Sequence, residues 1–193
     1  AGLGASRLVF GSPRNRDRTG LSDAQAHDQA VAFFRQAGDV AARHGVMLCL
    51  EAVAPLYGAN FMTTTLDCAT VVRAVDHPAL RMLLDTGAMQ INGEDPQDMV
   101  PYTADITEHI HLAEPGLIPY GDGNADYISV RDSLVRHVPR CAAALEILPG
   151  KAEPALPAMA RSLAFATALY RSADHCNRNT SSSEPAVNRA SVQ

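Results

Sequence analysis

The sequence predicts a parallel α/β fold. Five short apolar segments alternate with longer segments of helical periodicity, as in chains built from repeated βαβ units. The apolar segments are continuous, which is typical of strands covered on both faces. A closed barrel and an open sheet both fit this pattern. The glycine motifs GxGxxG and GxxxxGKS/T are absent, which weakens the nucleotide-binding kinds of open sheet.

The five strands are expected over residues 6–10, 46–51, 80–85, 109–114 and 143–148. In the fourth strand, which contains the stretch EHIHLAE, side chains alternate between the two faces. His109 and His111 therefore share one face, and Ile110 and Leu112 share the other. Taken alone, this stretch fits two hydrogen-bonded structural histidines better than a metal site.

The helix expected over residues 22–45 is the clearest one. Ser22 suits its N-cap, Gly45 suits its end, and the apolar residues between them recur with helical spacing. Further helices are expected over 65–75, 96–106, 126–138 and 154–173, and Pro101 weakens the one that contains it. Residues 173–193 are polar and are predicted to form a disordered tail.

The composition indicates one globular domain. The 193 residues are 47% hydrophobic and 19% charged, and a net charge of -5 with a pI near 5.8 argues against a nucleic-acid partner. No segment resembles a membrane span or a secretory signal. The cysteines lie far apart without a CxxC pair, so we expect a reducing, cytoplasmic location; they are Cys49, Cys68, Cys141 and Cys176. Because the first residue is not Met, we also expect the natural chain to begin earlier.

Four of the five strands end in the same way, with one side chain that can bind a metal followed by a turn-rich segment. These side chains are Glu51, Asp85, His111 and Glu146. They are separated by 34, 26 and 35 residues, close to the roughly 30 residues of one βαβ repeat. We therefore expect them at the same end of successive parallel strands, where three carboxylates repel one another unless a cation joins them. Oxygen-rich ligation with one nitrogen suits Mn²⁺, Mg²⁺ or Co²⁺, and Zn²⁺ is possible.

Simpler explanations exist for each residue taken singly. Any one of these acids can cap a strand or pair with an arginine, but four in matching contexts favour a shared site. His111, nearer the strand end, is the better ligand, whereas His109 is expected to be structural or to support a ligand. Arg14, Arg16 and Arg18 follow the first strand; they can meet a phosphate, although a solvated loop is the more common arrangement.

The segments LEAV, LLDTGAM, HIHLAE with PYGDG, and LEIL resemble the sugar isomerase and epimerase superfamily with the xylose-isomerase-like (β/α)₈ barrel. This superfamily includes ketose 3-epimerases, hydroxypyruvate isomerases and inosose dehydratases. The resemblance covers about residues 3–170, and GSP at 11–13 resembles the turn after the family's fourth strand. It implies a TIM-barrel (β/α)₈ fold of which this chain covers about the last five βα units, with residues 1–172 forming the partial barrel.

The resemblance also implies a function. Glu51, Asp85, His111 and Glu146 would hold a divalent metal ion, and the two glutamates would serve as acid and base. The expected activity is isomerisation or epimerisation of a small sugar, sugar phosphate or hydroxy-ketone, by proton transfer through an enediolate. Further candidates for contacts to the carbohydrate substrate are Tyr57, His109 and Glu114.

Three features depart from the family pattern. Ala88 stands where many relatives have a histidine three residues after the metal-binding aspartate. Glu114, Pro115, Gly116 and Leu117 stand where relatives often read D/E-x-N-R, so the usual arginine contact to substrate is missing. The first three βα units have no counterpart, and five strands cannot close a barrel. We expect a homo-oligomer or a chain completed by a missing N-terminal segment.

Other functions remain open. A metal-dependent sugar or inosose dehydratase uses the same scaffold. A truncated barrel can also be a non-catalytic remnant that binds a metal or a partner. An abasic-site endonuclease would need several more histidines, including one at position 88, and a basic groove for DNA, and the sequence shows neither.

Overall fold

Five parallel strands form one curved sheet in the computed structural model, which describes residues 2–148, 150 and 153–180. The strands are β1 (Arg7–Phe10), β2 (Met47–Glu51), β3 (Leu80–Asp85), β4 (Thr107–Ala113) and β5 (Ala142–Glu146), and they pair in chain order. All five expected strands are present, with boundaries that differ by at most two residues. Sequential parallel pairing means that each crossover connects neighbouring strands.

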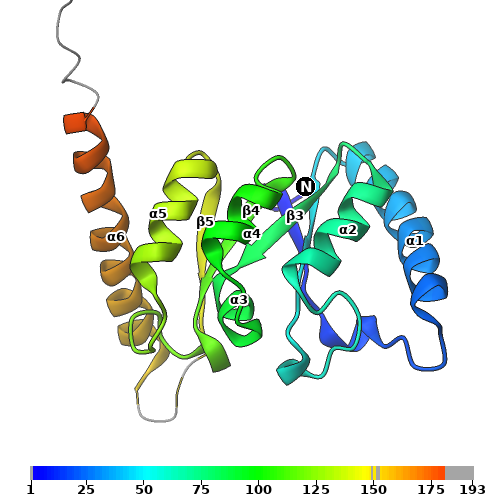
Figure 1. The fold of residues 1–193 in the computed structure, drawn as a ribbon, viewed down its shortest axis with the longest axis horizontal. Helices are drawn as coiled ribbons and strands as arrows, with labels where there is room; N and C mark the ends of the chain where they lie inside the picture. Colours follow the sequence, from blue (N-terminus) through cyan, green and yellow to red (C-terminus); the bar gives the residue numbers. More distant parts are fainter. Residues whose placement is uncertain (1, 149, 151–152, 181–193) are drawn as a thin grey trace, which may run out of the picture.

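One helix follows each strand except the third, which is followed by two. They are α1 (Asp23–Arg43), α2 (Thr65–Val75), α3 (Thr86–Asn92), α4 (Pro96–Thr103), α5 (Tyr127–His137) and α6 (Ala155–Thr180). Short 3₁₀ turns precede some of them: η1 (Pro13–Arg16), η2 (Pro55–Tyr57) and η3 (Pro115–Leu117). In Figure 1 the long helices follow one another across the molecule, from α1 at the right to α6 at the left.

Two helices differ from the prediction. Helix α3 begins directly after Asp85, where we expected a turn, because the Asp85 carboxylate caps it by accepting the N–H of Ala88 at 2.7 Å. Helix α6 continues past residue 173 to Thr180, because no glycine or proline interrupts that stretch. The last helix is thus longer than the expected 154–173, and the disordered tail stays a prediction, with residues 181–193 outside the described residues.

The main core lies between the sheet and the helices. Leu50, Leu84 and Ile110 project from one face of the strands and are at most 3% exposed. They belong to one cluster with Phe34 of α1 and Val72 of α2. The buried apolar residues therefore fix the helix-facing side of each strand, and the alternate residues face the concave side.

The concave side shows how strongly the sheet curves. Arg7 of β1 reaches Glu108 of β4, with its guanidinium 2.5 Å from the Glu108 carboxylate, across two intervening strands. Glu108 has no partner on β3, because Met82 pairs with Thr107 and Leu83 pairs with His109. This bulge bends β4 and allows the contact. The sheet is thus half of a barrel, and its concave side carries the candidate site.

Candidate metal centre

The four metal-capable side chains predicted from the sequence meet at the carboxyl ends of the strands. Glu51, Asp85 and Glu146 are the last residues of β2, β3 and β5, and His111 pairs with Asp85 in the ladder of β3 and β4. One potential ligand atom from each lies within 4.8 Å of the others. Four neighbouring strands, β2 to β5, thus bring four polar side chains into one small volume.

His111 lies at the centre of this cluster. Its Nδ1 is 3.0 Å from Oε1 of Glu51, 3.1 Å from Oε2 of Glu146 and 3.9 Å from Oδ2 of Asp85. Burial lowers the pKa of His111, but the hydrogen bonds and charges of Glu146 and Glu51 outweigh it and raise the pKa to about 10. In the metal-free cluster the imidazole therefore carries the positive charge that holds the carboxylates together.

The acids have different surroundings. Asp85 is buried, and its pKa is raised well above the ordinary range by burial and by the charge of Glu51. The pKa of Glu146 is lowered, chiefly by its hydrogen bond to His111 and against the effect of burial. The side chain of Glu146 is 40% exposed and that of Glu51 only 8%. The cluster is thus open to solvent on the side of β5.

The donor set fits a divalent cation. The three carboxylates supply hard oxygen ligands and the imidazole supplies one nitrogen, all within 4.8 Å of one another. One protonated imidazole offsets only part of their charge, and burial makes the remaining repulsion costly. Glu51, Asp85, His111 and Glu146 are the residues that would hold the ion.

A pocket of about 240 Å³ opens beside the cluster. Besides the carboxylates of Glu51, Asp85 and Glu146, its lining residues are Gly11, Pro13, Ala52, Val53, Ala54, Tyr57, Ala88 and Leu117. Of the three candidates for substrate contacts, Tyr57 alone lies in this lining. Its hydroxyl accepts the N–H of Gly116 at 2.9 Å and thereby joins η2 to η3.

His109 lies deeper on the concave face, as the alternation predicts. Its ring packs edge-on against the ring of His111, with centroids 5.4 Å apart. Its Nδ1 is buried without a hydrogen-bond partner among the described residues. Burial and the neighbouring His111 lower the pKa of His109, so it is neutral where His111 is charged.

Glu114 does not line the pocket. It is fully buried, and its Oε1 accepts hydrogen bonds from the Tyr127 hydroxyl and from the N–H of Gly121 at 3.2 Å. It therefore anchors the loop that follows η3. A direct contact of Glu114 with substrate has no support in this geometry.

Sequence reasoning missed Gly11 as a site residue. A Cβ atom on Gly11 would lie 1.9 Å from Oε2 of Glu51, so a side chain there would displace the carboxylate. The only sequence signal was the GSP turn at the end of the first strand.

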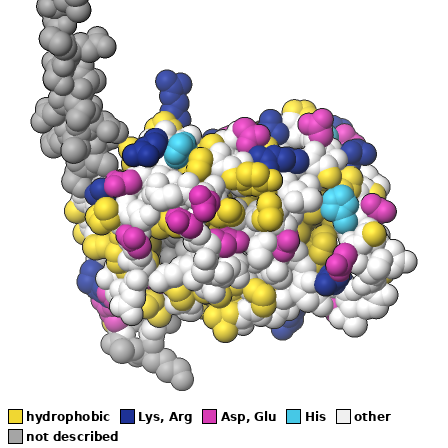
Figure 2. Space-filling model, in the orientation of Figure 1, with side chains coloured by type: hydrophobic (Ala, Val, Ile, Leu, Met, Phe, Trp, Pro, Cys, Tyr) yellow, Lys and Arg dark blue, Asp and Glu magenta, His cyan; other side chains and the backbone are white. Residues whose placement is uncertain are grey.

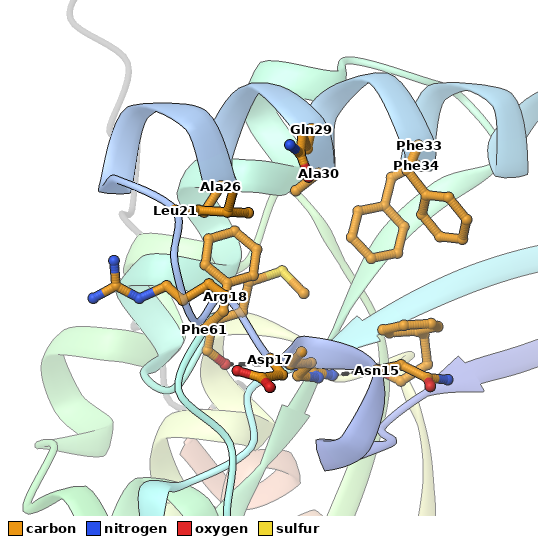
Figure 3. A pocket seen from close by; sticks show the side chains of 13 residues that line it. Asn15, Asp17, Arg18, Leu21, Ala26, Gln29, Ala30, Phe33, Phe34 and Phe61 are labelled. Carbon is orange, nitrogen blue, oxygen red and sulfur yellow. Dashed lines mark hydrogen bonds between the residues drawn. The ribbon is translucent and has the colours of Figure 1, made fainter.

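The three arginines after β1 have different surroundings. We expected Arg16 to meet a phosphate or to lie in a solvated loop. It is instead buried, and it donates to the carbonyl oxygens of Phe10 at 2.5 Å and Met62 at 3.2 Å. Arg18 pairs with Asp23, and Arg14 is exposed. A cavity of about 450 Å³, lined in part by Arg16, lies between η1 and α1, with the rings of Phe33, Phe34 and Phe61 turned toward it (Figure 3).

Other predictions concern the molecule as a whole. Cys49, Cys68 and Cys141 are free thiols, while the side chain of Cys176 lies outside the described residues. None of the described helices is both long and apolar enough to span a membrane. Acidic, basic and apolar side chains are interspersed on the face shown in Figure 2. The cytoplasmic location remains a prediction.

The curved parallel sheet, with a carboxylate and histidine cluster at the carboxyl ends of its strands, defines an α/β-barrel protein with a candidate metal centre. The family model described as xylose isomerase-like TIM barrel matches residues 1–168, and the chain belongs to this family. The predicted superfamily and the partial (β/α)₈ barrel are thereby confirmed.

Several solved structures share the fold. An L-ribulose 3-epimerase is 16% identical with a TM-score of 0.81, and the match covers 95% of this chain and 67% of that protein. A D-allulose 3-epimerase from Methylomonas sp. is 25% identical with a TM-score of 0.67, covering 77% and 51%. A family 2 AP endonuclease from Brucella melitensis is 20% identical with a TM-score of 0.64, covering 75% and 55%. A search of curated proteins found no match.

Proposed function

We propose that this chain carries the metal centre of a divalent-metal-dependent isomerase or epimerase that acts on a small sugar, sugar phosphate or hydroxy-ketone. One observation carries the proposal: four strands bring Glu51, Asp85, His111 and Glu146 within 4.8 Å of one another beside a pocket of about 240 Å³. The sugar epimerases among the structural neighbours support it. Mn²⁺, Mg²⁺ or Co²⁺ suits the donor set, and Zn²⁺ is possible.

A bound divalent ion would polarise the carbonyl group of the substrate and lower the barrier to removing a proton from the adjacent carbon. The two glutamates then carry the proton. Glu51 and Glu146 end strands on either side of β3 and β4, so their carboxylates approach the centre from two directions. One glutamate removes the proton and the other returns it, which inverts a carbon centre when they act on opposite faces.

A dehydratase is the enzymatic alternative. If both proton transfers occur on one face of the substrate, the same carboxylates move the carbonyl group or expel water. A non-catalytic metal- or partner-binding protein is the alternative outside enzymology. The geometry favours an enzyme because a pocket opens directly onto the cluster, which a purely structural ion does not require.

Endonuclease chemistry has weaker support, although one structural neighbour is a family 2 AP endonuclease. The centre contains one histidine among its four candidate ligands, and Ala88 lines the pocket where another histidine would be needed. The net charge of -5 also opposes binding to a phosphate backbone.

Solvent deuterium exchange tests the proposal. The full chain, saturated in turn with Mn²⁺, Mg²⁺ and Co²⁺, is incubated in D₂O with a panel of ketoses and hydroxy-ketones, and label beside the carbonyl is followed by NMR. Replacing Glu51→Gln or Glu146→Gln keeps the shape and one ligating oxygen but removes the base. We expect each change to slow exchange at least about 10²-fold, with a smaller loss of metal affinity.

Glu153→Gln is the matched control, because Glu153 pairs with Arg161 at 2.7 Å and does not line the pocket. It should leave exchange unchanged. Substrate deuterated beside the carbonyl reveals transfer that is shielded from solvent. Near-full turnover by either site variant would exclude the two-glutamate mechanism and favour a hydride shift or a non-catalytic metal site.

A further inference from the structure

The wall of the pocket beside the metal centre is largely apolar. Beyond the candidate ligands, the side chains that this chain contributes to the wall are Pro13, Ala52, Val53, Ala54, Ala88, Leu117 and Tyr57. Among the described residues that line the pocket, only Tyr57 offers a hydrogen-bonding side chain outside the candidate ligands. A polyhydroxylated ligand would therefore place hydroxyl groups against carbon.

The backbone holds Leu117 firmly in this wall. Leu117 has a φ of 55°, in the left-handed region that disfavours residues other than glycine. Its N–H donates to the Glu114 carbonyl at 2.8 Å, and its carbonyl accepts the N–H of Leu148 at 2.8 Å. Backbone strain of this kind persists where the surroundings impose it and is common at ligand-binding sites.

Tyr57 has limited capacity for a second polar contact. Its hydroxyl already accepts the N–H of Gly116, which leaves one proton to donate. One ligand oxygen can therefore be satisfied at this wall. Every further hydroxyl directed toward Ala88 or Leu117 would lose its hydrogen bonds to water without replacement.

Charge also limits the ligand. No lysine, arginine or histidine is among the described residues that line the pocket. Three carboxylates, a neutral imidazole and one divalent ion sum to one negative charge, so the loaded centre offers no net positive charge to a phosphate group that lies away from the ion. The buried Arg16 cannot help, because two of its nitrogens donate to backbone carbonyls and the side chain does not reach the solvent.

We propose that this pocket selects a short, unphosphorylated hydroxy-ketone whose end facing Ala88 and Leu117 is an alkyl group instead of a hydroxylated or phosphorylated chain. This inference rests on the proposed function and narrows its substrate class. Leu117 and Ala88 are specificity-determining residues, since they present apolar side chains to the ligand where a hydroxylated chain would need hydrogen-bond partners. A hydrophobic pocket typically rejects an added hydroxyl group by about 10²-fold at most.

Two compounds with the same four-carbon chain provide the test. Both 1-hydroxy-2-butanone and erythrulose carry a hydroxymethyl ketone, and erythrulose has two further hydroxyl groups. Dihydroxyacetone phosphate is the phosphorylated probe. Binding to the Mn²⁺-loaded full chain is measured by calorimetry, and deuterium exchange is measured in parallel. We expect 1-hydroxy-2-butanone to bind at least about tenfold more tightly than erythrulose, and the phosphate more weakly still.

Leu117→Arg should reverse this preference, because it adds a cation and removes the apolar surface. Leu163→Arg is the matched control: Leu163 is 59% exposed on α6 and does not line the pocket, so the binding ratios should stay unchanged. If the unaltered chain binds erythrulose or the phosphate as tightly as the alkyl compound, the specificity inference is overturned while the proposed function stands. If none of the three compounds binds to the metal-loaded chain, the specificity inference is overturned, and deuterium exchange over the wider panel of ketoses then decides the proposed function.

Discussion

At the scale of single residues, the charge of the cluster depends on one proton. His111 Nδ1 faces Glu51 and Glu146 at 3.0 and 3.1 Å, and this double contact raises the pKa of the imidazole to about 10, against the effect of burial. A metal ion binds only the neutral imidazole. The proton and the ion therefore compete for the same set of partners.

Metal binding should consequently release at least one proton per ion at neutral pH. His111 is protonated below about pH 10 in the metal-free protein, so metal affinity should rise about tenfold for each pH unit, from pH 6 to 8, if one proton is displaced. Calorimetry in buffers of different ionisation enthalpy measures this release. Binding with no proton release across that range would contradict the assigned state of His111.

Some residues of the site could be predicted from the sequence, and others could not. Strand alternation was enough to place His109 and His111 on one face, and repeat spacing was enough to group the four candidate ligands, which the structure confirms. Their role as ligands stays a prediction. Gly11 escaped detection because a missing Cβ leaves no pattern in the sequence, and its close approach to Glu51 brings the residue after β1 to the end of β2. The burial of Glu114 likewise depends on the loop fold.

At the scale of elements, capping and turn chemistry decide where helices begin. Asp85 belongs to a strand and also caps α3, so one carboxylate orders the helix and faces His111. The segment TGAMQIN has a glycine and a β-branched residue in its first turn, which favoured the incorrect prediction of a turn. Helix α1 was easier, because Ser22 and Gln25 form a capping box around its first turn.

The capping box gives a prediction for stability. Ser22 accepts the N–H of Gln25 at 3.3 Å, and the Gln25 side chain accepts the N–H of Ser22 at 2.9 Å. Ser22→Ala should lower the free energy of unfolding by about 1 kcal/mol, as is usual for a lost N-cap. Urea denaturation measures the change.

Ser12→Ala is the control, because Ser12 precedes η1 without making a capping hydrogen bond. It should change the free energy of unfolding by less than about 0.5 kcal/mol. Equal effects of the two substitutions would show that the capping box contributes nothing specific.

At the scale of the whole molecule, both sheet edges are open. Within the described residues β1 pairs only with β2, and β5 pairs only with β4. Leu8, Val9 and Phe33 near the β1 edge are 44%, 40% and 56% exposed. Unpaired strands with apolar neighbours are ready templates for association.

We therefore predict that the chain self-associates or loses compactness when it is studied alone. Sedimentation velocity should show dimers or larger species, and Leu8→Lys should shift them toward the monomer. Leu56→Lys is the control, since Leu56 is 68% exposed on η2, away from the strand edges. A compact monomer that melts cooperatively would refute this prediction.

The most direct test of the central claim is the metal content of the purified protein and of two histidine variants. After chelation and reloading with Mn²⁺ or Co²⁺, we expect about one ion per site by elemental analysis, and His111→Ala should remove most of it because the nitrogen at the centre of the cluster is lost. His109→Ala is the neighbouring control and should retain the ion. Loss of the ion in His109→Ala together with retention in His111→Ala would contradict the ligand assignment on which the account depends.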